Sequence, residues 1–170
     1  PLAPVALRMG GAQVELDPQG AERRALINGE KRTYVRVADF ISAVPAVTGK
    51  VELVYEGEQE GAGIVAEKLM GKAIRTQFLQ YFPDPEKTKK QKDKPNPYKP
   101  VQDWFGSRTI DLLHDASDED YRKVLDVVPG LKDLVQQSVP SELSKENLHF
   151  WMEFALHGMS EHSLISRNRL

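Results

Sequence analysis

The segment Leu148-His-Phe-Trp-Met-Glu-Phe-Ala-Leu-His-Gly-Met159 decides the fold class of this 170-residue chain. Its apolar side chains recur at the i, i+3, i+4, i+7, i+8 and i+11 spacing of one helix face: Leu148, Trp151, Met152, Ala155, Leu156 and Met159. Such a face needs other elements to cover it. The pattern therefore predicts a long buried helix, which we expect Ser144 to cap, in a mostly α-helical protein.

Shorter helices are predicted upstream of this segment. Ser117-Asp-Glu-Asp120 is typical of a helix start and would open a helix over 121–127. Pro129-Gly130 would end it, and a further short helix is predicted over 131–135. Because Pro100 can open a helix that reaches Phe105, the sequence predicts a C-terminal helical lobe over residues 101–170.

A composition shift precedes this lobe. Residues 83–100 contain five of the 11 prolines and six lysines against three acidic residues, a local net charge of +3 that leaves −5 on the remainder. We interpret this stretch as a solvated linker. Its lysines, with Tyr98 and Trp104 nearby, also allow contact with phosphates or an acidic partner, which is the less favoured interpretation.

The N-terminal half is also predicted to be helical. One amphipathic helix has its apolar stripe at Val65, Leu69, Ala73, Ile74, Phe78 and Phe82, with Lys68, Lys72 and Arg75 facing elsewhere. A short helix over 21–27 ends at Asn28-Gly29, and a second, kinked helix runs from Val37 to Val47. Residues 51–55 fit either a strand or the end of that helix. We therefore expect a helical region over 21–82, preceded by an irregular, poorly ordered extension over 1–20 with a brief strand at 12–16.

Composition excludes several classes of protein. The chain has no cysteine, so it has no disulfide framework, thiolate nucleophile or cysteine metal site. A net charge of −2 argues against a nucleic-acid binder held by bulk electrostatics, so nucleic acid is not an expected partner. The first residues lack the features of a signal peptide and no segment is long and apolar enough for a membrane span, so a cytoplasmic protein is expected.

Two glycine-containing segments partly match nucleotide-binding motifs, but neither has the residues that such a motif requires. Gly61-Ala-Gly63-Ile-Val-Ala66 has dinucleotide-fingerprint spacing, but the acidic run over 56–60 lies where a pyrophosphate would sit. Gly49-Lys50 has Val44 and Val51 where a phosphate loop needs Gly and Ser or Thr. No Walker B strand is present. We therefore expect no catalytic or cofactor-binding residue here, and this chain alone is not expected to hydrolyse a nucleotide.

The histidines and acidic clusters point to no metal site either. His149 and His157 are eight residues apart and form no HExxH motif, and a site made by His157, Glu161 and His162 is the less favoured interpretation. The acidic clusters lack the alternation of a calcium-binding loop.

Three runs resemble a known family: Ala21-Glu-Arg-Arg-Ala-Leu-Ile-Asn-Gly-Glu30, Val35-Arg-Val-Ala-Asp-Phe40, and Val44-Pro-Ala-Val-Thr-Gly-Lys-Val-Glu-Leu-Val-Tyr-Glu-Gly-Glu-Gln-Glu-Gly61. They are similar to the C-terminal part of magnesium-chelatase-type, MoxR-like AAA+ ATPases. A weaker likeness continues through Asp111-Leu-Leu, Val128-Pro-Gly-Leu131 and Leu156-His-Gly158, so it covers roughly residues 21–170.

The resemblance implies an AAA+ lid-like helical bundle followed by a C-terminal helical lobe. In this family ATP and magnesium are bound by a core that precedes the lid. The sensor arginine that opens a lid has no recognisable counterpart here, since Arg8 lies in a different context. The implied function couples nucleotide state to ring assembly and to remodelling or metal-insertion work.

The implied partners are the motor core, in cis or in trans, further copies in a homo-oligomeric ring, and a von Willebrand-type protein. A charged rim is expected to contact a neighbouring domain or subunit, with a solvated helix face as the alternative; its members are Glu22, Arg23, Arg24, Lys31, Arg32 and Arg36. The competing functions are a stand-alone helical interaction module acting in trans, and a weak nucleic-acid module using the lysines of 87–99.

Overall fold

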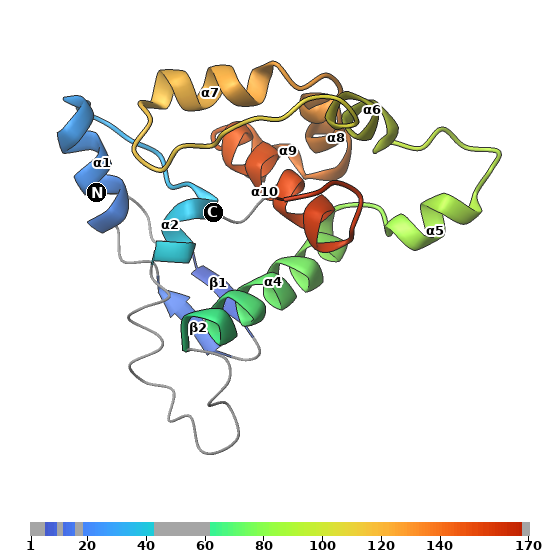
Figure 1. Ribbon diagram of the computed structural model, residues 1–170, viewed down its shortest axis with the longest axis horizontal. Helices are drawn as coiled ribbons and strands as arrows, with labels where there is room; N and C mark the ends of the chain where they lie inside the picture. The colour runs from blue at the N-terminus through green and yellow to red at the C-terminus, as the bar shows by residue number, and fades with distance from the viewer. Residues whose placement is uncertain (1–5, 10–11, 16–18, 43–61, 168–170) are drawn as a thin grey trace. The chain divides into compact units, whose positions relative to one another are not determined.

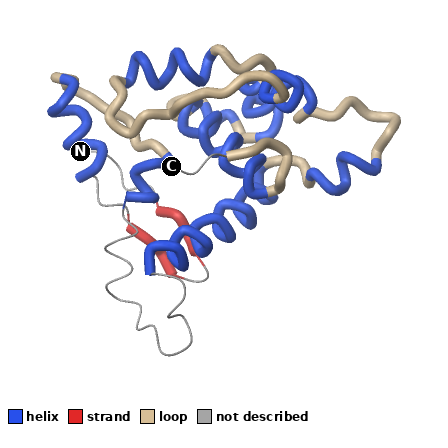
Figure 2. The backbone as a smooth tube through the Cα atoms, viewed as in Figure 1, coloured by secondary structure: helices blue, strands red, loops and turns tan. Residues whose placement is uncertain are grey.

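The computed structural model describes residues 6–9, 12–15, 19–42 and 62–167 (Figure 1). Most of the described residues are helical, as the sequence predicts (Figure 2). The chain divides into two compact units, residues 1–73 and 74–170. The division falls within the long helix α4 (Ala62–Tyr81), so its last turns and residues 83–100 belong to the second unit.

The first unit begins with a short antiparallel hairpin. Strand β1 (Ala6–Met9) pairs with β2 (Ala12–Glu15), with Ala6 opposite Glu15 and Met9 opposite Ala12. β2 falls in the region where alternation predicts a strand, whereas the sequence pattern did not indicate β1.

Helix α1 (Gln19–Asn28) follows and ends where predicted. Gly29 has φ +65°, a conformation that glycine adopts without steric cost. The amide of Glu30 donates to Ala25 O (2.8 Å) and that of Gly29 to Leu26 O (3.3 Å). These two bonds form a Schellman motif, which satisfies carbonyls at the helix end.

Helix α2 (Val37–Ser42) is the described part of the second predicted helix. Val37 and Phe40 are buried, as the apolar spacing indicates. The predicted kink near Pro45, the undecided segment 51–55 and the acidic turn over 56–61 lie outside the described residues.

Helix α4 confirms the prediction of a long amphipathic helix, with one difference. Ile74, Phe78 and the following Phe82 are buried as predicted. Leu69, predicted in the same stripe, is 48% exposed, and its neighbour Met70 is buried instead. The apolar residues at both positions make the local pattern ambiguous, and tertiary packing decides between them.

Residues 83–98 differ in part from the predicted solvated linker. Helix α5 (Pro85–Lys90) begins after Asp84, whose carboxylate accepts a hydrogen bond from the amide of Glu86 (2.9 Å). At the far end Tyr98 is 1% exposed, packs against Phe78 with ring centroids 6.0 Å apart, and donates its hydroxyl to Pro83 O. The ends of the segment are therefore tied together. Most of the segment is exposed, as a solvated linker would be, but Tyr98 departs from that prediction because its aromatic side chain fills a place in the core.

Burial also changes the acidity of this phenol. Removal of the Tyr98 hydroxyl from water raises its pKa well above the usual value, and the nearby charge of Asp84 raises it further. The hydroxyl is therefore neutral across the working pH range, which is the state in which it can donate to Pro83 O.

The rest of the second unit is a set of short helices around α10 (Leu148–Glu161). They are α6 (Lys99–Phe105), α7 (Asp118–Asp126), α8 (Leu131–Ser138) and α9 (Ser141–Ser144). α10 packs against α7 and α8, and Figure 1 shows it lying among the helices of this unit. Five side chains are fully buried in the core of this unit: Leu125, Leu131, Val135, Met152 and Met159.

The capping predictions have mixed outcomes. The Ser117 Oγ accepts a hydrogen bond from the amide of Asp120 (3.1 Å), which confirms Ser117 as a cap, although α7 begins earlier than predicted, at Asp118. The prediction for Ser144 is wrong: Ser144 ends α9, and Asn147 precedes α10. The one-turn helix α9 uses the serine that sequence reasoning had assigned to the longer helix.

Candidate functional site

The six residues of the predicted charged rim lie on α1 and on the segment that joins α1 to α2. Glu22, Arg23, Lys31 and Arg32 are exposed. Arg24 and Arg36 are each only 1% exposed, so the prediction that they form part of an outer rim is wrong. Charge alone cannot separate a surface arginine from a buried, paired one, and here the fold makes that choice.

Arg24 is held by a buried ion pair. Its Nη1 lies 2.6 Å from Asp39 Oδ1 and its Nη2 donates to the carbonyl of Tyr34 (2.7 Å). Both charged side chains are 2% exposed. A buried charge is tolerated only when it is paired and hydrogen-bonded, and this one is both.

Asp39 also lies in the first turn of α2. Its Oδ2 accepts a hydrogen bond from the backbone amide of Arg36 (2.8 Å), the residue just before the helix. An acidic side chain that reaches back three residues to the amide preceding a helix makes half of a capping box. One carboxylate thus connects α1, the joining segment and α2. Because Arg36 is not a typical N-cap residue, the sequence carries no complete capping-box signature for this role.

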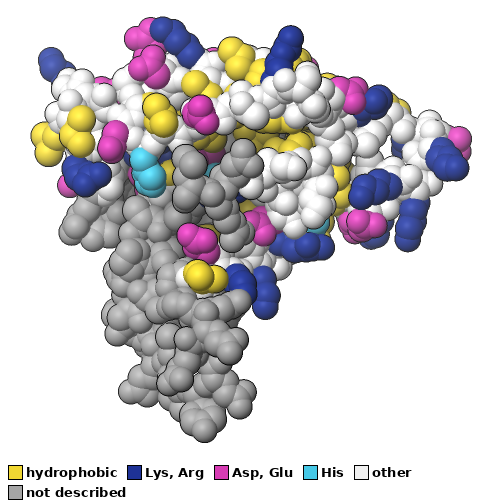
Figure 3. Space-filling model, viewed as in Figure 1, with side chains coloured by type: hydrophobic (Ala, Val, Ile, Leu, Met, Phe, Trp, Pro, Cys, Tyr) yellow, Lys and Arg dark blue, Asp and Glu magenta, His cyan; other side chains and the backbone are white. Residues whose placement is uncertain are grey.

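The outer side of α1 combines apolar and charged groups. Leu26 is 83% exposed and Ile27 is 59% exposed. Glu22, Arg23, Leu26 and Ile27 share one helix face, because residues three and four apart lie together on a helix. Figure 3 shows hydrophobic and basic side chains next to each other over α1. We call this surface, with Lys31 and Arg32, the α1 face.

Exposed leucine and isoleucine in adjacent positions distinguish the α1 face from an ordinary charged surface. A solvated helix face carries charged or polar residues there, and an apolar pair flanked by charges is typical of a protein contact. The charged members were found from the sequence, whereas Leu26 and Ile27 were not. Leu26 and Ile27 are the only large apolar residues of α1, so the sequence alone favours their burial, and only the structure shows that Ala21 and Arg24 are buried instead.

A second buried polar cluster connects α7 and α10. The hydroxyl of Tyr121 donates to Glu153 Oε2 (2.6 Å), and His157 Nε2 lies 3.6 Å from Glu153 Oε1. Glu153 is 1% exposed. The cluster has the phenol, carboxylate and imidazole that acid-base chemistry uses, but the carboxylate at its centre is closed off from solvent. Its geometry fits a structural tie between two helices.

The other histidines of α10 and its end have separate partners. His149 Nε2 lies 2.8 Å from Asp126 Oδ1, and His162 Nε2 lies 3.2 Å from the carbonyl of Arg75. Arg75 Nη1 in turn donates to the carbonyl of Glu161 (3.0 Å). Within the described ranges no three His, Asp or Glu side chains are grouped as they would be to bind a metal ion.

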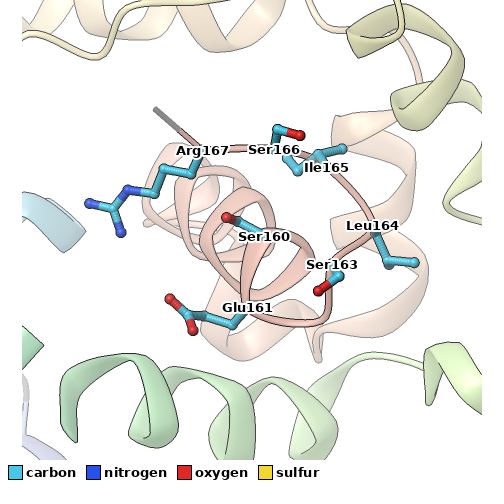
Figure 4. A pocket seen from close by; sticks show the side chains of 7 residues that line it. All are labelled: Ser160, Glu161, Ser163, Leu164, Ile165, Ser166 and Arg167. Carbon is cyan, nitrogen blue, oxygen red and sulfur yellow. The ribbon is translucent and has the colours of Figure 1, made fainter. Parts of the chain in front are cut away.

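An open hollow of about 520 Å³ lies beyond the end of α10. Figure 4 shows its lining side chains pointing in different directions, and they are Ser160, Glu161, Ser163, Leu164, Ile165, Ser166 and Arg167. No pair of a nucleophile and a base is brought together in it. The hollow therefore offers less basis for a function than the α1 face.

Comparison of the chain with protein-family models, with curated proteins and with solved structures finds no match. Among the helices that the structure describes, none has both the length and the apolar character needed to cross a bilayer.

Proposed function

We propose that this chain is the C-terminal helical portion of a magnesium-chelatase-like AAA+ ATPase and that it docks on the motor core through the α1 face. The core supplies the ATP and magnesium site. The chain supplies helices that convert nucleotide state into ring assembly and into remodelling or metal-insertion work. The proposal rests on the resemblance of residues 21–61 to this family and on the character of the α1 face.

The exposed pair Leu26 and Ile27 is the single observation that carries the docking step. Burial of one such side chain contributes about 1.5–3 kcal/mol to an association, so the pair is able to anchor a contact. The flanking charges of Arg23, Lys31 and Arg32 suit a partner surface with acidic groups, which would set orientation and rate of association.

The Arg24–Asp39 ion pair supports the same proposal in a different way. It fixes α1 to α2 through a buried, hydrogen-bonded contact, so the α1 face is presented by a rigid element. A coupling element has to be rigid, because a nucleotide-driven rotation passes through it only if the element moves as one body.

The first test concerns the gene. We expect the DNA upstream of the Pro1 codon to encode a phosphate loop and a Walker B strand in the same or a shifted frame. Their absence would overturn the proposal and leave a stand-alone helical module that binds its partner in trans.

The second test measures the contact directly. The upstream core, produced without residues 21–170, should bind the separately produced chain, and the variant Leu26→Asp/Ile27→Asp should lose at least tenfold in affinity. The matched control is Leu113→Asp/Val127→Asp, which places the same two negative charges on apolar side chains of the second unit that are 68% and 58% exposed. Equal binding by both variants, or ATP turnover by the chain alone, would contradict the proposal.

A further inference from the structure

Residues 83–98 form a fixed loop that displays lysines. We call this segment the lysine loop. Its exposed basic side chains are Lys87, Lys89, Lys90, Lys92 and Lys94. The Asp84 cap and the buried Tyr98 hold its two ends, and the amide of Tyr98 donates to Asn96 Oδ1 (2.9 Å). The lysines are thus carried by an anchored element of the second unit.

The acidic residues of this region neutralise little of the charge. Lys89 Nζ lies 3.7 Å from Glu86 Oε1, and both side chains are more than half exposed, so that pair contributes little. From residue 86 to residue 108 there are seven basic and three acidic residues, a net charge of +4, which leaves −6 on the rest of the chain. Figure 3 shows basic side chains gathered over the part of the second unit where α5 lies. The net charge of the whole chain is small, so it does not reveal this local positive charge.

An aromatic group follows the loop on α6. Arg108 lies over the ring of Trp104, with its guanidinium carbon 5.7 Å from the ring centroid. Trp104 is partly exposed and Arg108 is exposed. The planar faces of an indole and a guanidinium are the groups on which unpaired nucleobases stack.

We propose that the lysine loop and Trp104 bind single-stranded nucleic acid without sequence preference. The lysines contact successive phosphates, while Trp104 and Arg108 stack on a base. The pair of Trp104 and Arg108 favours this ligand over an acidic protein segment, because carboxylate side chains do not stack on an indole ring as nucleobases do. The buried Tyr98 takes no part in stacking. The proposal is independent of the docking function of the α1 face.

Binding is measured with a fluorescently labelled 20-nucleotide poly(dT), by anisotropy, on the whole chain. Five phosphate contacts give a slope of about −3.5 for log K against log salt, so affinity should fall about 100-fold between 50 and 200 mM salt. Changing the five exposed lysines of the loop to glutamine should remove both the binding and the salt dependence. The matched control changes five exposed lysines outside both proposed surfaces, by the same total charge, and should bind like the parent: Lys68, Lys72, Lys123, Lys132 and Lys145.

Stacking has its own readout, which an acidic peptide would not produce. The chain has two tryptophans, so in the Trp151→Phe variant all tryptophan emission comes from Trp104. Poly(dT) should quench that emission, and poly-L-glutamate should not. Three results would overturn the proposal: no binding at 50 mM salt, equal loss in the control variant, or displacement of poly(dT) by poly-L-glutamate at matched charge without any quenching.

Discussion

Gly158 is the position at which the packing of the second unit is most sensitive to a single methyl group. It lies in α10, and a Cβ placed on it would come within 2.0 Å of Cδ2 and 2.6 Å of Cγ of Phe78. Cγ joins the ring to Cβ and Cδ2 is bonded to Cγ, so neither atom can shift far unless the whole side chain moves. The variant Gly158→Ala therefore forces either the ring or the helix to move.

Phe78 has no room to move away. It is fully buried, stacks on Phe82 with centroids 4.7 Å apart, and also contacts the rings of Tyr98 and His162. Alanine favours a helix by about 1 kcal/mol over glycine. Overpacking a well-filled core costs about 1–3 kcal/mol, and a contact this short lies at the upper end. We expect a net loss of about 2 kcal/mol in the free energy of unfolding.

Urea unfolding followed by circular dichroism and tryptophan fluorescence would measure this loss. Ser160→Ala on the same helix is the control, because it raises helix propensity without adding volume, and it should change stability by less than about 0.5 kcal/mol. In the Phe78→Leu background the cost of Gly158→Ala should shrink, since the clashing ring is gone. A Gly158→Ala chain as stable as the parent would refute the reasoning.

Three further predictions concern polar groups. Asp39→Asn leaves Arg24 buried without its ion pair, so α1 and α2 should lose about 3–5 kcal/mol of protection in hydrogen exchange while the second unit stays unchanged. Ser117→Ala should cost about 1 kcal/mol in urea unfolding through loss of the α7 cap, and Ser117→Asp should retain most of it. The raised pKa of Tyr98 contributes stability that is fully present below pH 10 and is lost above it, at up to about 1.4 kcal/mol per pH unit. This loss should be absent from the alkaline unfolding of Tyr98→Phe. If the free energy of unfolding of that variant falls with pH as steeply as that of the parent, the role given to Tyr98 is contradicted.

Much of the local structure was predictable because its signals lie within a few residues. The periodicity of α4 and α10, the glycine that ends α1 and the serine that caps α7 each act through contacts inside one or two helical turns. The same reasoning identified the charged members of the α1 face.

The tertiary structure decided what each polar or aromatic side chain does. Arg24 and Tyr98 both belong to stretches that look solvated, yet both are buried. Their burial is not visible locally, because their partners Asp39 and Pro83 lie 15 residues away along the chain. Glu153 likewise meets Tyr121 across 32 residues. Local propensity carries no information about such distant pairs.

The sequence by itself determined that this chain is mostly helical, where most of its described helices lie, and that a positive charge is concentrated in residues 83–100. Only the tertiary structure decided that this charge is carried on a closed loop and that Leu26 and Ile27 stay outside the core. The physical reason is that helix formation depends on neighbours in the chain, whereas burial depends on which distant surfaces meet.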